Sequence, residues 1–404
     1  MSKYVESLLN SKRVLLLQGP MGDFFTRLAK WLNEQNIECF KINFNKGDQY
    51  FSKTMQNCFG YTDTLENFSF WLEQFVIEHQ IDTIVCFGDC RFYHVIAKEV
   101  SLQCQINFFA FEEGYVRPNY ITFEKDGVNF YSNFNDAFAA GYSLKKSSIE
   151  EAIEIVEPVD NQFSIMVLSA ILYYWFWAIG HKDYPHYQHH RQIAPKRELY
   201  YWFISGLRRI KNYFVEKLSF KRFIQQHSKQ YFVFALQVHN DSQILTHSDL
   251  KSVELYIKKV MNSFAQYADK DHHLVLKHHP MDRGYRDYSK LIKELEEKLN
   301  IVGRVHYFCD VHLPTLLKHS LGMVTVNSTT GIQALYHQIP VKTLGHAIYN
   351  LPDLTNQYPL QNFWKDPGVV DIVYFYNFRS RLIHYSQLNG SFYGKSPWMK
   401  KKYK

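Results

Sequence analysis

The chain has 404 residues, enough for two or three domains, with 46% hydrophobic and 21% charged residues. This composition excludes a disordered chain, and the length buries a core without disulfide or metal staples. The 46 basic and 39 acidic residues leave a formal charge of +7. That charge is small for a chain of this size, and we expect no nucleic-acid partner.

Strand and helix patterns alternate along the first 111 residues. Short apolar runs predict strands over residues 13–18, 38–44, 82–87 and 105–111. Apolar residues at helical spacing predict helices over residues 24–35, 65–79 and 91–101. This alternation indicates βαβ units and a parallel sheet. Residues 120–132 then predict a hairpin with Asp126 and Gly127 at its turn.

The middle of the chain is aromatic and basic. Residues 164–179 form an apolar run of sixteen, short of the ~20 needed to span a bilayer. A buried helix, an interfacial helix and a membrane span all remain open for it. Residues 181–229 carry a net charge of +8, and apolar side chains repeat there at helical spacing. Such a helix is typical of a membrane surface, and a connector helix packed on a domain is the alternative.

A second alternating block begins near residue 230. Strands are predicted over residues 231–237, 273–277, 304–308, 322–326 and 340–344. Helices are predicted over residues 250–267, 288–299, 313–319 and 331–337. The chain is therefore expected to have one Rossmann-like domain over residues 1–150 and a basic helical linker over 151–229. A second Rossmann-like domain with a C-terminal tail would occupy residues 230–404. Ligands would bind in a cleft between the domains, beyond the carboxyl ends of the strands.

Five polar motifs follow these predicted strands. Gln18 to Gly22 contains two glycines that allow close backbone approach, and Leu236 to Asp241 is a polar cluster. Glu112 and Glu113 before Gly114 offer carboxylates that could act as a base or a nucleophile.

The other two motifs suit a phosphate. His278 and His279 in Lys277-His-His-Pro280 could donate to a phosphate or a leaving group. Asn327-Ser-Thr-Thr-Gly331 combines hydroxyls with the free N–H groups of a helix start. Together the five motifs favour a nucleotide-sugar transferase.

These motifs carry a resemblance to a known family. The runs are Leu15 to Phe25, Lys41 to Asp48, Phe87-Gly88-Asp89, Phe111 to Pro118, and Asn327 to Thr355. They resemble capsule polysaccharide biosynthesis proteins of the KpsS type, over roughly residues 13–355. The resemblance implies a glycosyltransferase of the GT-B type, with two Rossmann-like domains facing a cleft. It also implies CMP-Kdo as donor and a (lyso)phosphatidylglycerol acceptor, on which the poly-Kdo linker of a capsule is started. Because donor and product are both β-linked, the transfer would retain configuration.

The resemblance also implies roles for the site residues. Glu113 or Glu112 would be the catalytic carboxylate, and His279 would stabilise or protonate the departing phosphate. The donor-binding residues would be Gln18, Gly19, Lys277, His278, Pro280, Asn327, Ser328, Thr329, Thr330 and Gly331. Arg117 and Lys277 are candidates for pairing with the sugar carboxylate. The basic candidates for membrane binding are Arg208, Arg209, Lys211, Lys217, Lys221 and Arg222.

No cofactor is expected beyond the donor itself. CMP leaves as a monophosphate, so no metal ion is needed to bridge a diphosphate, and no DxD motif stands at the end of a predicted strand. The six cysteines form no CxxC pair, and the N-terminus lacks a signal-peptide layout. We therefore expect a cytoplasmic protein, peripheral on the inner face of the inner membrane, with other capsule biosynthesis and export proteins as further partners. A related transferase using another CMP-sugar or a glycan acceptor, and a non-enzymatic capsule-assembly scaffold, are the alternatives.

Overall fold

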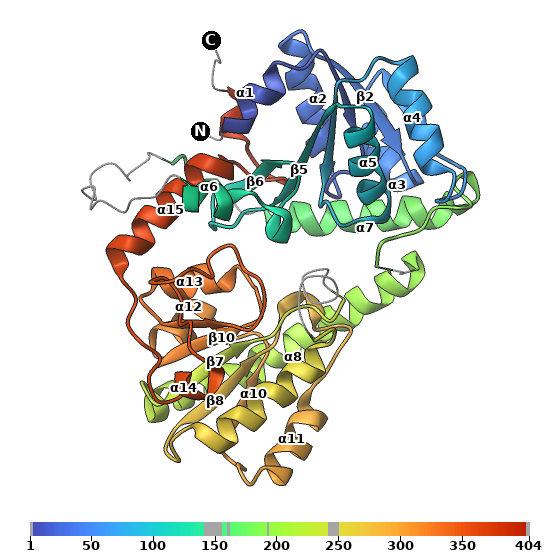
Figure 1. The fold of residues 1–404 in the computed structure, drawn as a ribbon. Helices are drawn as coiled ribbons and strands as arrows, with labels where there is room; N and C mark the ends of the chain where they lie inside the picture. The colour runs from blue at the N-terminus through green and yellow to red at the C-terminus, as the bar shows by residue number, and fades with distance from the viewer. Residues whose placement is uncertain (1–2, 141–155, 160–161, 192–193, 241–249, 401–404) are drawn as a thin grey trace. The chain divides into compact units, whose positions relative to one another are not determined.

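The computed structural model describes residues 3–140, 156–159, 162–191, 194–240 and 250–400 (Figure 1). The chain divides into two units. The first consists of residues 1–199 with residues 379–404, and the second of residues 200–378. The helix α8 (Pro195–His227) begins in the first unit and continues in the second, and α15 (Ile372–Ser386) leads back into the first.

The first unit is built on a seven-stranded sheet in the order β12-β6-β5-β4-β1-β2-β3. Its strands are β1 (Arg13–Leu16), β2 (Glu38–Asn43), β3 (Asn57–Gly60), β4 (Thr83–Phe87), β5 (Asn107–Glu113), β6 (Tyr120–Lys125) and β12 (Gln387–Asn389). The first five are parallel, whereas β6 and β12 extend the sheet with antiparallel pairs. The parallel strands have the 3-2-1-4-5 order of a Rossmann domain.

Helices cover both faces of this sheet, because successive strand side chains point to opposite sides. Leu16 packs in one core cluster with residues of α1 (Lys3–Leu9) and α2 (Phe24–Glu34). Leu15 packs in the other, with residues of α4 (Phe68–Glu78) and α5 (Phe92–Gln103). The remaining helices of the unit are α3 (Lys46–Ser52), α6 (Phe134–Ala140) and α7 (Phe163–Ile179).

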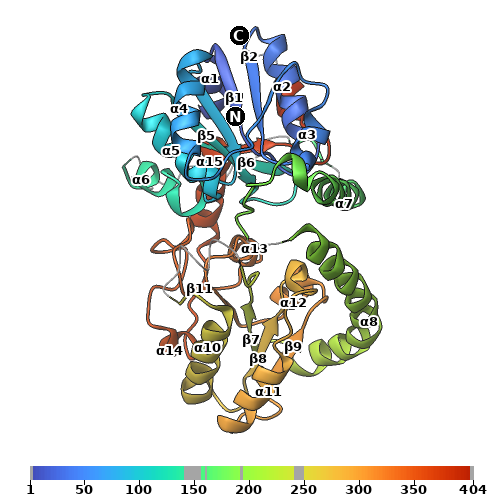
Figure 2. The ribbon, with the colours of Figure 1, turned by 90° about the vertical axis from the view of Figure 1, so that its right-hand side faces the viewer.

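The second unit has a five-stranded, fully parallel sheet in the order β11-β10-β7-β8-β9. Its strands are β7 (Tyr231–Ala235), β8 (His273–Lys277), β9 (Val305–Phe308), β10 (Gly322–Thr325) and β11 (Val341–Thr343). Its other helices are α10 (Val253–Tyr267), α11 (Ser289–Lys298), α12 (Leu313–Lys318), α13 (Thr330–Tyr336) and α14 (Leu360–Phe363). In Figure 2, α8 runs along one side of this unit.

The prediction of two Rossmann-like α/β domains is confirmed, but two of its boundaries are wrong. Residues 379–404 belong to the first unit, and the predicted linker over residues 151–229 is divided between the two units after residue 199. β12 pairs with β6, and Trp398 packs against Trp31 with ring centroids 5.1 Å apart. An edge strand leaves backbone N–H and C=O groups unpaired, and β12 satisfies them on β6.

The predicted hairpin over residues 120–132 is also wrong. A turn does form at Asp126 and Gly127, which both have positive φ. However, β6 pairs with β5 and β12, and residues 129–131 form a 3₁₀ turn rather than a returning strand. β6 therefore pairs with the strand that precedes it and with the distant β12, and the turn at Asp126 and Gly127 does not return the chain as a strand.

The apolar run over residues 164–179 forms α7, which has two different faces. Ser169, Ala170, Tyr173, Tyr174 and Trp177 are buried in the first unit. The opposite face leaves large apolar side chains exposed: Ile165, Leu168, Ile171, Trp175 and Ile179. Among the described helices, none is long and apolar enough to cross a membrane.

We expect Gln387→Met to destabilise the first unit. The buried Gln387 amide accepts hydrogen bonds from the N–H groups of Tyr115 (2.9 Å) and Val116 (3.3 Å), and it donates to Thr122 Oγ1 (3.0 Å). Methionine keeps the volume and leaves two buried N–H groups unpaired, at a cost of about 3 kcal/mol. Urea unfolding measures this loss, with the exposed Gln103→Met as control. Equal stability of the two variants would contradict the assigned role of Gln387.

Candidate functional site

Each unit places polar residues at the point where its strand order reverses. In such sheets ligands bind outside the carboxyl ends of the strands at this switch point. In the first unit it lies between β1 and β4, which are followed by Gln18-Gly19 and by Gly88. In the second unit it lies between β7 and β10, which are followed by Gln237 and Asn327.

Gln18, predicted to bind the donor, is buried and engaged within its own unit. Its Nε2 donates to the hydroxyls of Tyr173 (2.9 Å) and Tyr187 (3.0 Å) and to Asp48 (3.2 Å). Its Oε1 accepts from Arg91 (2.9 Å). Gln18 therefore connects α7 to the sheet and orients Arg91, which is a different role from a direct donor contact.

Arg91 is a residue of this site that the sequence analysis missed. It precedes α5, directly after β4, and its guanidinium also donates to the Gly19 carbonyl (3.3 Å) and lies over the Phe87 ring. A Cβ atom on Gly88 would lie 3.6 Å from Glu112 Oε2 and 3.7 Å from Arg91 Nε. The glycine thus lies between a carboxylate and a guanidinium. The sequence signal was an arginine two residues beyond the Gly88-Asp89 pair.

The two adjacent glutamates end β5 in different environments. Because strand side chains alternate in direction, Glu112 and Glu113 point to opposite faces. Burial, together with the charges of Glu113 and Asp89, raises the pKa of Glu112 to about 7, although the hydrogen bond from the Glu113 N–H and the charge of Arg91 act in the opposite direction. Glu113 is exposed, with Arg117 Nη2 3.8 Å from its carboxylate.

These environments suit two different chemical roles. A carboxyl group whose pKa lies near neutrality can accept and return a proton, as a general base or acid does. An exposed carboxylate beside a guanidinium suits a nucleophile or a charge partner. Arg117, expected to pair with the sugar carboxylate, has an exposed side chain and donates to the Gly114 carbonyl (3.1 Å).

In the second unit, two loops are joined by a pair of amide hydrogen bonds. Gln237 Nε2 donates to Asn327 Oδ1 (2.8 Å), and the Asn327 N–H donates to Gln237 Oε1 (3.1 Å). Ser328 Oγ accepts from both the N–H (3.3 Å) and the hydroxyl (2.9 Å) of Thr330. The predicted phosphate loop is therefore an ordered turn at the start of α13.

Gly331 in this loop allows a close approach by an aromatic side chain. A Cβ atom there would fall 2.3 Å from the Tyr349 hydroxyl, which itself donates to the Ser328 carbonyl. The glycine is thus required by packing against Tyr349.

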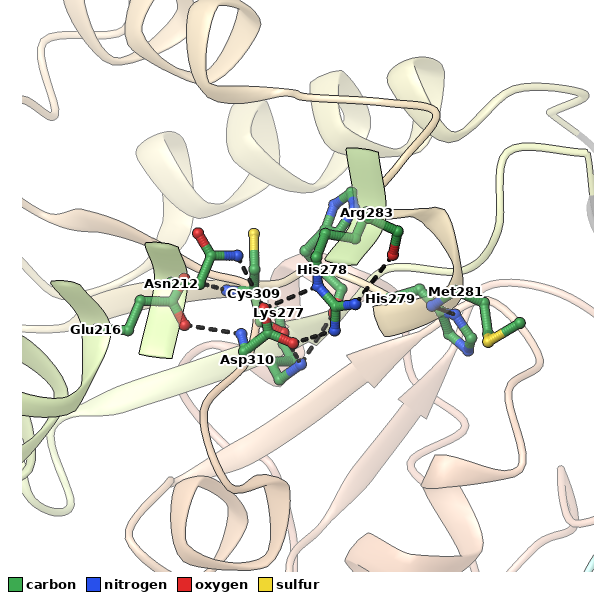
Figure 3. Close-up of polar contacts among 10 residues, drawn as sticks. Asn212, Glu216, Lys277, His278, His279, Met281, Arg283, Cys309 and Asp310 are labelled. Carbon is green, nitrogen blue, oxygen red and sulfur yellow. Dashed lines mark hydrogen bonds and ion pairs between the residues drawn. The ribbon is translucent and has the colours of Figure 1, made fainter. Parts of the chain in front are cut away.

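The Lys277-His278-His279-Pro280 segment follows β8, and its side chains have unlike surroundings (Figure 3). His278 is buried, and its Nδ1 lies 2.7 Å from the Tyr307 hydroxyl. Burial lowers the pKa of His278, so this ring is neutral at pH 7. His279 is half-buried, and its Nδ1 accepts from the Met281 N–H (3.2 Å). The proton of a neutral His279 ring is therefore on Nε2. In this tautomer the ring can donate a hydrogen bond from Nε2 to a phosphate.

Lys277 is used differently from the expectation that it pairs with the sugar carboxylate. Its side chain is buried, and Nζ donates to the carbonyls of His278 (2.9 Å) and Cys309 (2.6 Å). Burial also lowers its pKa. Lys277 thus joins the loops after β8 and β9, and its ammonium is not presented to solvent.

A network that the sequence did not reveal fixes these loops to α8 (Figure 3). Asp310 pairs with Arg283, whose Nε lies 2.8 Å away, and accepts from Asn212 Nδ2 (2.8 Å). The Glu216 carboxylate accepts the N–H groups of Cys309 (2.8 Å) and Asp310 (2.7 Å). Asn212 and Glu216 lie one turn apart on α8. Their spacing alone does not indicate that they contact the loop after β9, which is distant in the sequence.

Between residues 203 and 218, the helix α8 turns polar residues toward the unit and large apolar residues toward solvent, whereas Phe223 near its end is buried in the core of the unit. Asn212 and Glu216 contact the loop after β9, and Arg208 donates to the carbonyls of Arg283 (2.6 Å) and Arg286 (3.2 Å). The opposite face holds large apolar side chains that are half or more exposed: Phe203, Leu207, Ile210, Phe214 and Leu218.

Most of the basic residues predicted on this helix lie on its open side. Lys211, Lys217, Lys221 and Arg222 are exposed, and Arg209 is exposed as well. Arg208 is the exception, because its guanidinium is engaged by two backbone carbonyls of the second unit. The membrane-binding role predicted for Arg208 is therefore corrected to a structural one.

The pKa of Glu112 predicts how stability depends on pH. Between its ordinary value of 4.5 and about 7, the folded protein keeps a proton on Glu112 that the unfolded chain has released. The free energy of unfolding therefore falls as the pH rises through this window. We expect Glu112→Gln to make that fall shallower, as measured by urea unfolding at several pH values. Parallel curves for the two proteins would contradict the raised pKa.

Known proteins resemble this chain over almost its whole length. The profile of the family described as "Capsule polysaccharide biosynthesis protein" matches residues 82–393. A capsule polysaccharide modification protein LipB of Neisseria meningitidis serogroup B is 41% identical, over 97% of this chain and 94% of its own. The capsule polysaccharide export protein KpsS of Escherichia coli is 37% identical, over 96% of this chain and 98% of its own.

A solved structure also matches this chain, at lower similarity. It is the Thermosulfurimonas dismutans KpsC, a beta Kdo 2,7 transferase, with a TM-score of 0.44 and 14% identity over 93% of this chain and 92% of its own. The identities and coverage of the two sequence relatives, together with the family profile, are decisive. This chain belongs to the capsule polysaccharide biosynthesis protein family.

Proposed function

We propose that this protein is a retaining glycosyltransferase that moves Kdo from CMP-Kdo to a (lyso)phosphatidylglycerol acceptor. The product would start the poly-Kdo linker of a capsular polysaccharide. Membership of the capsule family and two Rossmann-like units with polar loops at their switch points support a sugar-nucleotide transferase. The observation that carries the proposal is the pair of glutamates at the end of β5, with unlike exposure and a pKa of about 7 for Glu112.

The proposed reaction is a double displacement. The Glu113 carboxylate attacks the anomeric carbon, the bond to CMP breaks, and a glycosyl ester forms on the enzyme. An acceptor hydroxyl then attacks the same carbon and releases Glu113, while Glu112 takes the hydroxyl proton. Two inversions give retention. His279 would donate from Nε2 to the departing phosphate, and the Ser328–Thr330 turn would bind it.

The exposed apolar faces support a lipid acceptor at a bilayer surface. Phe203, Phe214 and Leu218 on α8 are 57–72% exposed, and the basic residues Lys217 and Lys221 lie among and beside them. Apolar side chains that enter the lipid interface, flanked by cations that attract anionic headgroups, are the two features of an interfacial helix. We therefore propose that α8 docks on the anionic inner face of the inner membrane.

Purified protein incubated with CMP-Kdo and a fluorescent lyso-phosphatidylglycerol analogue, without added metal, tests the activity directly. Mass spectrometry should show a lipid product heavier by one Kdo residue. Release of CMP without a lipid product would move the acceptor to a glycan. No turnover by folded protein with intact donor would favour another donor or a scaffold role.

The two glutamates should differ in their effect on this reaction. We expect Glu113→Gln to lower turnover by a factor of about 10³ or more, because the amide cannot form the ester intermediate. Glu112→Gln should lower it by a factor of about 10² to 10⁴ and remove the pH dependence that an essential base gives. The exposed Glu99→Gln serves as control. Unchanged turnover in Glu113→Gln would exclude it as nucleophile, and unchanged capsule formation would favour the scaffold.

Membrane docking through α8 predicts a charge-dependent loss of binding. Replacing Lys217, Lys221 and Arg222 with glutamine removes three cations, each contributing about 1 kcal/mol near an anionic surface. Sedimentation with phosphatidylglycerol liposomes should therefore weaken by roughly a hundredfold, whereas the weak binding to neutral liposomes should not change.

A matched control removes the same charge from another exposed surface of the second unit. Glutamine at Lys270, Lys293 and Lys298 should leave liposome binding as in the wild type. If both triple variants bind equally well, α8 is not the docking surface.

A further inference from the structure

Three histidines of the second unit come together at the edge of the sheet opposite the polar loops. His227 lies in the last turn of α8, His273 is the first residue of β8, and His306 is the second residue of β9. One ring nitrogen from each lies within 4.8 Å of the others. All three side chains are half-buried, so the cluster is shielded yet reachable from solvent.

The spacing of these nitrogens matches a tetrahedral zinc ion. Zinc binds histidine nitrogen at about 2.0–2.1 Å, so two ligands of a regular tetrahedron are about 3.3 Å apart. His306 Nε2 and His273 Nδ1 are 3.2 Å apart. The rings of His227 and His273 are also close, with centroids 3.9 Å apart. Only a small movement of the His227 ring is needed to bring the third nitrogen to the same distance.

An aromatic side chain shields one side of the cluster. Phe223 packs against His306 and His227, with ring centroids 4.5 Å and 5.2 Å away. An apolar shell of this kind orients the ligands and limits the access of water.

Two other features of the cluster bear on its ligand. Arg304 also faces His273 and lowers its pKa, but its guanidinium is directed to the carbonyls of His272 and Asp269. No carboxylate of the described residues joins the group. An all-imidazole set suits zinc and copper, and disfavours magnesium and calcium, which take oxygen ligands.

We propose that His227, His273 and His306 form a zinc site, with water as the fourth ligand. The ion would tie the C-terminal end of α8 to β8 and β9. This site is separate from the proposed transfer chemistry, because it lies at the amino ends of strands whose carboxyl ends carry the polar loops. Its role is therefore to anchor the helix that presents the exposed apolar face.

Metal binding to the full-length chain, purified without a histidine tag and treated with chelator, tests the site. We expect one Zn²⁺ per chain by calorimetry, and the visible absorption of tetrahedral Co²⁺ when that ion is the probe. Zinc should also raise the thermal unfolding temperature of the wild type by several degrees, since a ligand bound only by the folded state stabilises it.

Variants connect this binding to the three histidines. His306→Gln should weaken zinc binding at least tenfold and abolish the zinc-dependent rise in unfolding temperature. His227→Gln, at a partly exposed helix end, should have the same two effects. It provides the test if His306→Gln does not fold. His337→Gln, in the same unit but outside the cluster, should bind zinc as the wild type does. Equal affinity in all the folded variants, or no tetrahedral Co²⁺ spectrum in the wild type, would overturn the proposal.

Discussion

The second unit depends on the ion pair between Arg283 and Asp310. Both side chains are largely removed from solvent, with 10% and 15% of their areas exposed. An uncompensated charge at such a position is costly, so each residue fixes the other in place. The Asp310 carboxylate also accepts a hydrogen bond from Asn212, and the Asp310 N–H group donates one to Glu216. The loops after β8 and β9 and the helix α8 are therefore one connected structure.

This connection explains why α8 has an unusual orientation. An amphipathic helix normally buries its apolar stripe, yet here the polar stripe is used for contacts with the unit. Once Arg208, Asn212 and Glu216 are engaged, the geometry of the helix places Phe203, Ile210 and Phe214 on the outside. Exposing these apolar side chains to water is unfavourable, and contact with lipid would remove them from water. The same polar contacts thus order the loops after β8 and β9 and define the proposed docking face.

Much of the fold could be predicted because parallel strands and their helices have local signals. The strand over residues 273–277 was predicted with its correct bounds, and the loops at both switch points were predicted as polar. β12 could not be predicted, because a three-residue strand has no pattern until its partner is known. The contacts that Gln18 and Lys277 make inside the protein could not be predicted for a related reason. Residue type indicates what a side chain can bind, whereas burial and neighbouring carbonyls decide what it does bind.

The position of β12 also has a consequence for how the chain folds during synthesis. Gln387 of β12 bonds to Thr122 across 265 residues, and the whole second unit lies between them. Domains generally fold as units while the ribosome extends the chain from the N-terminus. Here the β6 edge of the first sheet stays open until β12 emerges behind the second unit, so the first unit is completed only after the second has been translated. In the interval, β6 exposes an unpaired edge that invites association with other chains.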